Sequence, residues 1–575
     1  MIAQWKQMAA TAVLGIAVAF VVSGCGGGDT GASPAASPAP PPAATAQNIN
    51  PMPRERLRDG GTVTLAVEQI PSTFNYNHVD GGLYDTANIV WALMPYMFGN
   101  DGAGVPIWNP DYLASEPAIA IGPKPVVTYE VNPQAAWDDG TPLTWQDFYW
   151  QWQALSGKNP AYRIVSSSGY EDIADVERGK DDREVVVTFE RPYADWQKLF
   201  FPLYPASTNK DPQIFNEGWK GGALVTAGPF KLGSINATTK TLTLLRNEKW
   251  WGARPKLDAI VFRAMPVDAQ IDALANGEID AMDIGSDVSK YRRALAVPGI
   301  EMRISAGPNY RHLTFNGMSP SLSDVRVRRA IAMAIDRAAI ARALLGPLGI
   351  EARPLDNHVF MANQEGYRDN AGEVGTYDPT KAAQLLDEAG WKLEGGVRKK
   401  DGMRLEISLV IPAGILASRQ ESELIQNMLG QVGVSLKIDT VPNDDFFDRY
   451  ITPGQFDLTV FSWMGTPYPI ADSRSLYGRP SLDAEGRLNV QQNYARIGSE
   501  ELDDLLARAI AEFDRGKAEA LANEADAMIW QEVHSLTLYQ RPDLIAVKKD
   551  LANYGAFGIA QPWPYADMGW VAAAK

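Results

Sequence analysis

The sequence predicts an α/β protein in which mixed sheets form the cores of two or three lobes. Segments with alternating apolar residues are typical of strands, and amphipathic segments that carry capping residues are typical of helices. The two kinds of segment follow one another through most of the C-terminal half. A chain of 575 residues is too long for one hydrophobic core. In α/β folds of this kind, ligands bind beyond the ends of strands.

The expected strands share an alternation of apolar and polar side chains. The first lies within 60–71, and 72–85 follows it as a polar loop that carries aromatic residues. Further strands are expected at 126–131, 183–190, 226–232, 311–316, 404–412, 435–441 and 456–463, with two more around a tryptophan-bearing loop within 241–265.

The expected helices carry their own start and stop signals. Thr144 and Asp147 have the spacing of a capping box. Asp378 is a suitable N-cap, Pro379 fits the first helical position and Gly390 closes the helix. Helices are therefore expected at 144–155, 323–345, 377–391 and 421–434, and a helix, turn and strand at 269–285.

The N-terminus contains Cys25, the single cysteine of the chain, which excludes an internal disulfide and a paired-thiol metal site. The apolar run Met8–Val22 is shorter than the roughly 20 residues that span a bilayer, and it ends in small residues, as a processed signal does. Val22-Ser23-Gly24-Cys25 resembles the lipobox of bacterial lipoproteins, whose cysteine becomes the first mature residue and carries lipid. The alternative is an ordinary signal peptide with an incidental cysteine.

The segment that follows Cys25 is rich in Gly, Ser, Ala and Pro and has almost no large apolar residue. Such a composition cannot offset the entropy of ordering, so a disordered tether is expected. We therefore expect a signal peptide at 1–24 and a lipidated cysteine with its tether at 25–59. The folded part would then lie at the outer face of the cytoplasmic membrane, with the lipid as its only membrane attachment.

Composition excludes several classes of function. The net charge of −16 argues against binding to nucleic acid. Four scattered histidines without an HExxH motif argue against zinc or haem, and no cofactor is expected. No G-x-S-x-G motif is present, so an enzyme is not expected. A secreted hydrolase with paired carboxylates remains a remote alternative.

Several segments resemble, in order, the extracellular solute-binding proteins of dipeptide, oligopeptide and nickel ABC importers. Trp137–Thr144 is similar to the family's W-S-D-G-x-P-L-T, and Asn247–Asp258 to its N-P-x-Y-W-x-G-x-P-x-L-D. The other matching segments are Leu274–Asp280, Phe315-Asn316 with Asp324–Ala330, Asp336-Arg337, and 377–391. Each match alone is weak, but their common order makes the resemblance specific.

The resemblance implies a two-lobed periplasmic-binding-protein-like fold of type II, the large peptide-binding class, that closes on a ligand by hinge motion. Lobe one would comprise 60–305 and 541–575, with an extra subdomain near 89–225, and lobe two would comprise 306–540. The family also implies a monomer that delivers a small-molecule ligand to an ABC transporter permease.

One departure from the family concerns the ligand. Peptide binders often carry W-x-x-D-Y-x-D-P, whose first aspartate holds the peptide's α-ammonium group. Here Thr466 stands in that place, and it brings no charge. The stretch 465–469 instead resembles actinobacterial lipoprotein members, so a peptide and a glycolipid of the phosphatidylinositol-mannoside kind both stay open. Asp472 is a candidate replacement for the missing carboxylate.

The candidate ligand site combines aromatic residues that would stack on a ligand with residues that would hydrogen-bond it. For each, the alternative is simple packing in a core or a solvated loop. The expected ligand-binding residues are Trp463, Thr466, Tyr468, Tyr539, Asn75, Tyr76, Tyr84 and Asp472. The predicted function is that of a lipid-anchored solute-binding subunit. The alternative is an envelope lipoprotein that binds a glycolipid or acts as a scaffold without transport.

Overall fold

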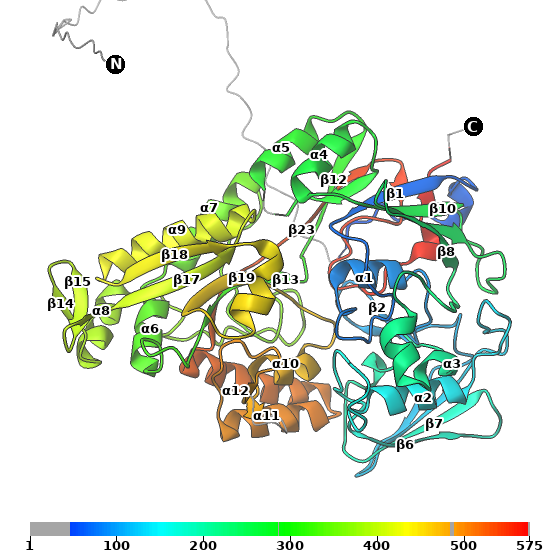
Figure 1. Cartoon of the computed structure of the whole chain (residues 1–575), viewed down its shortest axis with the longest axis horizontal. Helices are drawn as coiled ribbons and strands as arrows, with labels where there is room; N and C mark the ends of the chain where they lie inside the picture. The colour runs from blue at the N-terminus through cyan, green and yellow to red at the C-terminus, as the bar shows by residue number, and fades with distance from the viewer. Residues whose placement is uncertain (1–46, 286, 483–487, 573–575) are drawn as a thin grey trace, which may run out of the picture. The chain divides into compact units, whose positions relative to one another are not determined.

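The computed structural model describes residues 47–285, 287–482 and 488–572. The expected signal peptide, Cys25 and residues 26–46 of the expected tether lie outside these residues. Residues 47–59, expected to belong to the disordered tether, are described and contact the end of the chain: Asn48 forms a β-bridge with Ala556, and Leu57 is buried and forms one with Val571. Figure 1 shows the strands and helices that follow.

The first large sheet has seven strands in the order β12-β23-β11-β1-β10-β9-β8. The central strand β1 is parallel to β10, and the late strand β23 pairs antiparallel with β11 and β12, which returns the end of the chain to this sheet. Along β1 alternate side chains are buried, as the sequence pattern predicts. The strands are β1 Thr62–Val67, β8 Phe230–Asn236, β9 Thr241–Arg246, β10 Ala259–Ala264, β11 Ala281–Asp283, β12 Ile300–Ser305 and β23 Asp543–Lys548, and α4 Val267–Ala275 and α5 Val288–Leu295 accompany them.

The second large sheet has five strands in the order β18-β17-β19-β13-β22 and a hydrophobic core of its own. Its strands are β13 Asn309–Phe315, β17 Glu406–Pro412, β18 Ser435–Val441, β19 Leu458–Met464 and β22 Ser535–Gln540. The helices of this lobe are α6 Val325–Met333, α7 Arg337–Leu345, α8 Pro379–Glu388, α9 Leu416–Gln431, α10 Pro469–Tyr477, α11 Glu500–Ala511 and α12 Arg515–Glu532.

The single helix expected over 323–345 is wrong, because the chain forms α6 and α7 there. Asp336 lies between them and caps α7, since its carboxylate accepts a hydrogen bond of 2.8 Å from the amide of Ala339. The sequence gives no sign of this break, because it contains no proline or glycine there and the helical spacing of apolar residues continues across it.

A four-stranded sheet in the order β4-β5-β7-β6 is inserted between β1 and β8 of the chain. It contains β4 Ala118–Ala120, β5 Val126–Glu130, β6 Ile173–Arg178 and β7 Glu184–Phe189, and α2 Trp145–Leu155 packs on it (Figure 1). The predicted capping box is confirmed, as the amide of Thr144 donates to the carboxylate of Asp147 over 2.8 Å. The boundaries expected for the lobes and the extra subdomain remain predictions.

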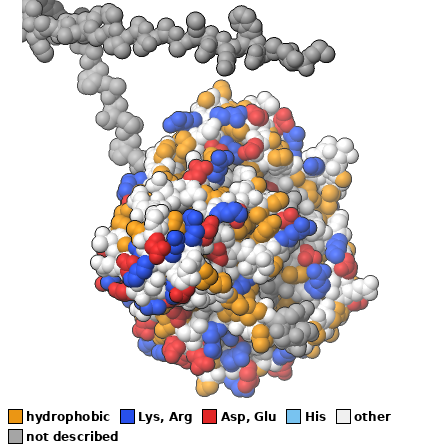
Figure 2. Space-filling view, turned by 60° about the vertical axis from the view of Figure 1, so that its left-hand side comes forward, with side chains coloured by type: hydrophobic (Ala, Val, Ile, Leu, Met, Phe, Trp, Pro, Cys, Tyr) orange, Lys and Arg blue, Asp and Glu red, His pale blue; other side chains and the backbone are white. Residues whose placement is uncertain are grey.

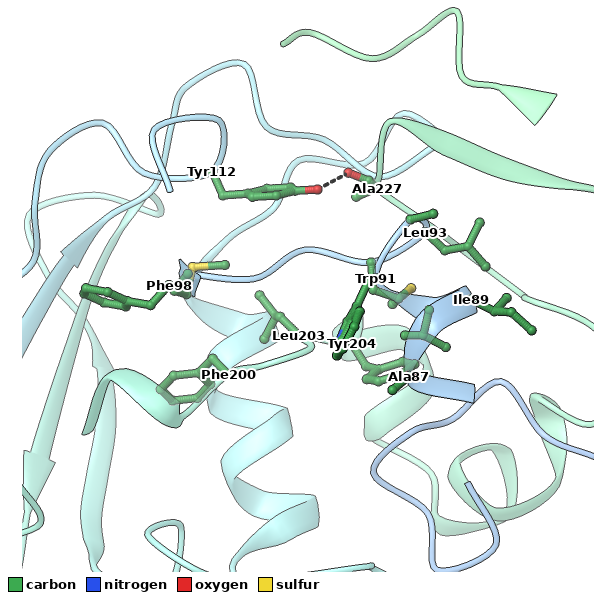
Figure 3. Close-up of a cluster of buried hydrophobic side chains, with 14 of the residues drawn as sticks. Ala87, Ile89, Trp91, Leu93, Phe98, Tyr112, Phe200, Leu203, Tyr204 and Ala227 are labelled. Carbon is green, nitrogen blue, oxygen red and sulfur yellow. Dashed lines mark hydrogen bonds between the residues drawn. The ribbon is translucent and has the colours of Figure 1, made fainter. Parts of the chain in front are cut away.

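The core of lobe one continues into the inserted segment. Figure 3 shows Ala87 and Ile89 of the short helix α1 (Tyr84–Val90) in one buried cluster with Tyr204, Leu203 and, on the far side of the cluster, Phe200. Tyr112 fixes the same cluster by donating a hydrogen bond of 2.9 Å to the carbonyl of Ala227. The segment around residue 200 is therefore anchored in the core. The preceding residues are anchored as well, since Trp196 and Leu199 are buried.

Two chain crossings join the lobes, at 306–308 and at 541–542. They touch at Gly307, where an added Cβ would lie 2.4 Å from the carbonyl oxygen of Arg541. Gln540 also donates a hydrogen bond of 2.6 Å to the carbonyl of Gly307. The close approach of the two crossings therefore requires glycine at this position.

The remaining elements are short: α3 Ala206–Asn209, β2 Phe98–Asn100, β3 Pro106–Trp108, β14 Lys392–Glu394, β15 Val397–Lys400, β16 Met403–Arg404, β20 Ser481–Leu482, β21 Leu488–Asn489, β24 Leu551–Ala552 and β25 Gly569–Trp570. Among the described residues, no helix has the length and apolar character needed to cross a membrane. On the face seen in Figure 2, basic and acidic side chains are interspersed rather than gathered in patches of one sign.

Candidate ligand-binding site

The connection from β19 to α10 carries the predicted site residues Thr466 and Tyr468, and Asp472 lies in the first turn of α10. The hydroxyl of Thr466 donates to one carboxylate oxygen of Asp472 and accepts a hydrogen bond of 3.2 Å from the amide of Tyr468. Gln364 holds the same loop through a hydrogen bond of 3.1 Å to the carbonyl of Thr466. The structure thus brings Thr466, Tyr468 and Asp472 together, and Thr466 is fully engaged within the loop.

This loop contacts the inserted segment of lobe one. We call the contacts between 194–198 and 466–472 the seam. Its centre is an ion pair between the ammonium group of Lys198 and the second carboxylate oxygen of Asp472, whose side chains are 31% and 24% exposed. Beside it, the amide of Ala471 donates to the carboxylate of Asp195 over 3.2 Å. A hydrogen bond of 2.9 Å from Ala194 to the carbonyl of Ile510 extends the contact.

The seam holds two carboxylates around one ammonium group. Burial alone would lower the pKa of Lys198, but the charges of Asp472, Tyr193 and Asp195 and the hydrogen bond to Asp472 together outweigh it, so this pKa lies above its ordinary value. Burial raises the pKa of Asp195 to about 6, although the charge of Lys198 acts in the opposite direction. Lys198 is therefore charged at neutral pH, and burial makes Asp195 ionise less readily than a free carboxyl group.

Tyrosines surround the charged pair. Burial raises the pKa of Tyr76 and of Tyr468, and the charges of Lys198 and neighbouring carboxylates act on both phenols. Both hydroxyls therefore stay protonated at neutral pH. Tyr76, from the loop after β1, thus lies close enough to Lys198 and Asp472 for their charges to act on its phenol.

Trp463 is packed against other rings of the protein. Its indole lies parallel to the ring of Tyr494 at 5.6 Å and to that of His312 at 5.9 Å between centroids. The side chain is partly buried. In this conformation Trp463 therefore contributes to packing at the end of β19, and its predicted role in stacking on a ligand remains a prediction.

Two of the predicted residues have their polar groups engaged inside the protein. Tyr539 is 0% exposed and donates a hydrogen bond of 2.7 Å to the carboxylate of Glu421. Asn75 is also fully buried, where it donates to the carbonyl of Phe215 over 2.9 Å and accepts from the amide of Asn77. These hydrogen-bond partners of Tyr539 and Asn75 lie outside the seam.

Tyr84 lies apart from these residues, at the start of α1. Its side chain is 50% exposed and meets the ring of Trp563 edge-on at 6.3 Å. Burial of the hydroxyl raises its pKa, and the charges of Asp543 and Asp283 raise it further. Tyr84 is thus half-exposed, and Asp543 and Asp283 are close enough for their charges to act on its hydroxyl.

Those acidic groups form a cluster that the sequence analysis did not find. Asp283 ends β11 and pairs with Arg541, on a chain crossing, at 2.5 Å. Glu68 follows β1, and its pKa is raised by burial and by the charges of Asp85 and Asp283. Burial likewise raises the pKa of Asp543 to about 7. The sequence signal that could have predicted this cluster is the presence of polar residues at the ends of β1 and β11, because ligand sites in α/β folds lie at strand ends.

Two surface hollows lie away from the seam. One of about 380 Å³ is lined in lobe two by Phe456, Asp457 and Arg496, and one of about 350 Å³ in lobe one by Asn276, Lys549 and Trp570. Neither contains a predicted site residue. Within the described ranges, no group of three metal-ligating side chains is assembled.

The comparisons with known proteins agree with the fold and with its two-lobed arrangement. The family model of bacterial extracellular solute-binding proteins, family 5 middle, matches residues 122–481. The chain belongs to this family. Its members are substrate-binding proteins, and the resemblance stated from the sequence motifs is confirmed.

Relatives within the family differ in how much of this chain they match. Oligopeptide-binding protein OppA of Mycobacterium tuberculosis (strain H37Rv) is 39% identical over 553 residues, which is 95% of this chain and 91% of OppA. The probable monoacyl phosphatidylinositol tetramannoside-binding protein LpqW of the same organism is 30% identical over 212 residues, 36% of this chain and 33% of LpqW. The structure of a periplasmic EDTA-binding protein, EppA, covers 92% of this chain and 98% of its own, with a TM-score of 0.84 and 24% identity, which shows the shared fold.

Proposed function

We propose that this solute-binding protein captures a peptide between its lobes and delivers it to an ABC permease. The observation that carries the proposal is the 39% identity to OppA along 95% of the chain, which includes both sides of the seam. The seam supports it as well, because charged and phenolic groups from both lobes converge there, as a site that closes on a polar ligand requires. No catalytic step is part of the proposal.

Native mass spectrometry of the protein purified from its own host tests this function. We expect a bound small molecule that denaturation releases and whose fragments identify it as a peptide. An empty protein whose melting temperature does not shift with peptide or polyol libraries would contradict the proposal and favour a scaffold without transport.

The site assignment is tested separately. Replacement Trp463→Ala is expected to remove most of the affinity for the released peptide while the lobes stay folded. Circular dichroism and the melting temperature check the fold, and isothermal titration measures the affinity. Unchanged affinity would remove Trp463 from the site, and Tyr539→Phe serves as the comparison because Tyr539 is buried away from solvent.

We also propose that lipid on Cys25 anchors the protein, as a monomer, at the outer face of the cytoplasmic membrane. The motif Val22-Ser23-Gly24-Cys25 supports this proposal. Replacement Cys25→Ser should release soluble or unprocessed protein, and intact mass shows whether lipid is attached. Lipid still attached to the variant would contradict the anchor.

A glycolipid is the second candidate ligand. The partial match to LpqW and the uncharged Thr466 favour it. The match to OppA is longer and closer, so a peptide is preferred. In the same mass spectra, a released lipid mass in place of a peptide would decide for the glycolipid.

A further inference from the structure

Asp472 is occupied on both of its carboxylate oxygens. Thr466, six residues away, donates to one oxygen, and Lys198, 274 residues away, pairs with the other. A peptide's α-ammonium group would need the charge and an open oxygen of such a carboxylate. In this structure the protein's own lysine takes that place.

The position of Lys198 is built into the fold rather than set by a free surface side chain. Trp196, two residues earlier, is buried, and its ring meets Phe98 edge-on at 5.3 Å. On the other side Tyr204 donates a hydrogen bond of 2.6 Å to the carbonyl of Phe74. The bond from Ala471 to Asp195 then joins this segment directly to α10. Both partners of the ion pair are therefore held in place by their own segments.

This arrangement changes the electrostatic cost of a ligand's amino end. A free ammonium group near Asp472 would lie beside the like charge of Lys198 in a partly desolvated place, where repulsion is stronger than in water. A blocked amino end brings no charge and avoids that repulsion. The hydroxyl of Tyr76, which lies near the pair and is protonated, can donate to or accept from a neutral amide.

We propose that Lys198 is a specificity-determining residue that serves as the internal counter-ion of Asp472, so that the protein accepts peptides whose amino end carries no positive charge. N-acylated peptides are the ligand class that fits. This inference rests on the proposed function, since it takes the ligand to be a peptide that reaches the seam.

Asp195 is the competing partner for an ammonium group. One of its carboxylate oxygens accepts the amide of Ala471, and its pKa of about 6 leaves it mostly ionised at neutral pH. The two carboxylates and one lysine then carry a net charge of about −1. The experiment therefore has to distinguish an ammonium group that binds Asp195 in the wild type from one that binds Asp472 after Lys198 has been removed.

The test is isothermal titration of the mature protein, freed of bound ligand by unfolding and refolding. The probes are short synthetic peptides, each made with a free and with an acetylated amino end. For the wild type, acetylation should leave affinity within about threefold or increase it. For Lys198→Met, which frees Asp472, the free form should bind at least about 30-fold more tightly than the acetylated form.

Matched variants isolate the charge. Lys198→Arg keeps the cation and should behave as the wild type, and Lys198→Met combined with Asp472→Asn removes both charges and should abolish the new preference. Lys124→Met removes a lysine from a surface ion pair with Glu190 in the same inserted segment and should change nothing. If Lys198→Met does not refold, Lys198→Gln provides the same loss of charge with a polar side chain.

Three outcomes would overturn the inference. A wild type that binds free peptides much more tightly than acetylated ones would do so, particularly if Asp195→Asn removes that preference. Lys198→Met with no new preference would do so as well. If no peptide of either kind binds any of the variants, the proposed function fails, and that result is distinct from the other two.

Discussion

Two ion pairs in this protein use the same chemistry in different surroundings. Arg311 on β13 and Glu421 on α9 are 6% and 0% exposed, and Arg311 reaches the carboxylate through two of its nitrogens, at 2.5 and 3.0 Å. Tyr539 and Ser418 complete the hydrogen bonds around them. Lys198 and Asp472 are instead about one-third and one-quarter exposed and come from different lobes.

The difference separates a structural pair from an exchangeable one. Arg311 and Glu421 lie within one lobe and are shielded from water. Separating them would leave two buried charges without solvation, which costs a large amount of free energy. Lys198 and Asp472 keep access to water, so a ligand or solvent can replace either partner at modest cost. The same pairing of charges thus stabilises lobe two in one place and selects a ligand in the other.

The largest expected effect comes from breaking the buried pair. Glu421→Gln keeps the shape of the side chain but leaves the charge of Arg311 buried without compensation, so the free energy of unfolding should fall by about 3–5 kcal/mol. Denaturant unfolding followed by circular dichroism measures it. A loss below about 1 kcal/mol would mean that water reaches Arg311 and that the two pairs do not differ as described.

Asp543 offers a third case, a carboxylate that forms no ion pair of its own with the described residues, to set beside the two ion pairs. Asp543 has a pKa of about 7 because burial disfavours its charge, while Arg541 pairs with Asp283. The folded state then holds a proton that the unfolded state has lost, so this group's contribution to stability falls as pH rises from about 4 to 7. Relative to the wild type, Asp543→Asn should therefore gain unfolding free energy between pH 5 and pH 8, by an amount on the order of 1 to 3 kcal/mol.

The pH dependence can be measured by denaturant unfolding of both proteins at the two pH values. Glu68 and Asp85 lie in the same cluster and also have raised pKa values, so the difference between the two proteins is the informative quantity. Equal differences at pH 5 and pH 8 would show that Asp543 does not titrate in this range.

Breaking the seam pair should affect stability far less than breaking the buried pair. Lys198→Met is expected to change the free energy of unfolding by less than about 1 kcal/mol, because both side chains are partly solvated. Lys124→Met provides the baseline in the same denaturant experiment. A loss as large as that for Glu421→Gln would make Lys198 a structural residue.

A similarly small effect is expected at Thr466. Thr466→Val removes the hydroxyl that donates to Asp472 and should cost about 0.5–1 kcal/mol of stability. Thr466→Ser keeps the hydroxyl and is the matched control. If valine and serine behave alike, the hydroxyl contributes nothing to the loop before α10.

Local sequence signals predicted much of the fold. Alternation identified β1, and Asp378 caps α8 with Pro379 at its first position, as expected. Each of these signals depends on residues within one element. The break between α6 and α7 was missed because Asp336 interrupts the helix without disturbing the apolar period.

The candidate site was less accessible from the sequence. Asp472 was proposed as a replacement carboxylate, but its partner Lys198 is 274 residues away and belongs to no motif. Tyr539 was chosen as an aromatic residue that could stack on a ligand, but its hydroxyl binds Glu421, 118 residues away, inside the protein. Pairs of this kind are created by tertiary packing, which one sequence without an alignment does not encode in its local pattern.

The most direct test of capture between the lobes is a crystal structure of the protein with the ligand that it carries from its own host. We predict a peptide at the seam, with its uncharged amino end near Asp472, Lys198 and Tyr76, and with the Lys198–Asp472 pair intact. A ligand bound elsewhere, for example in the hollow lined by Phe456 and Arg496, with an unoccupied seam would contradict the account.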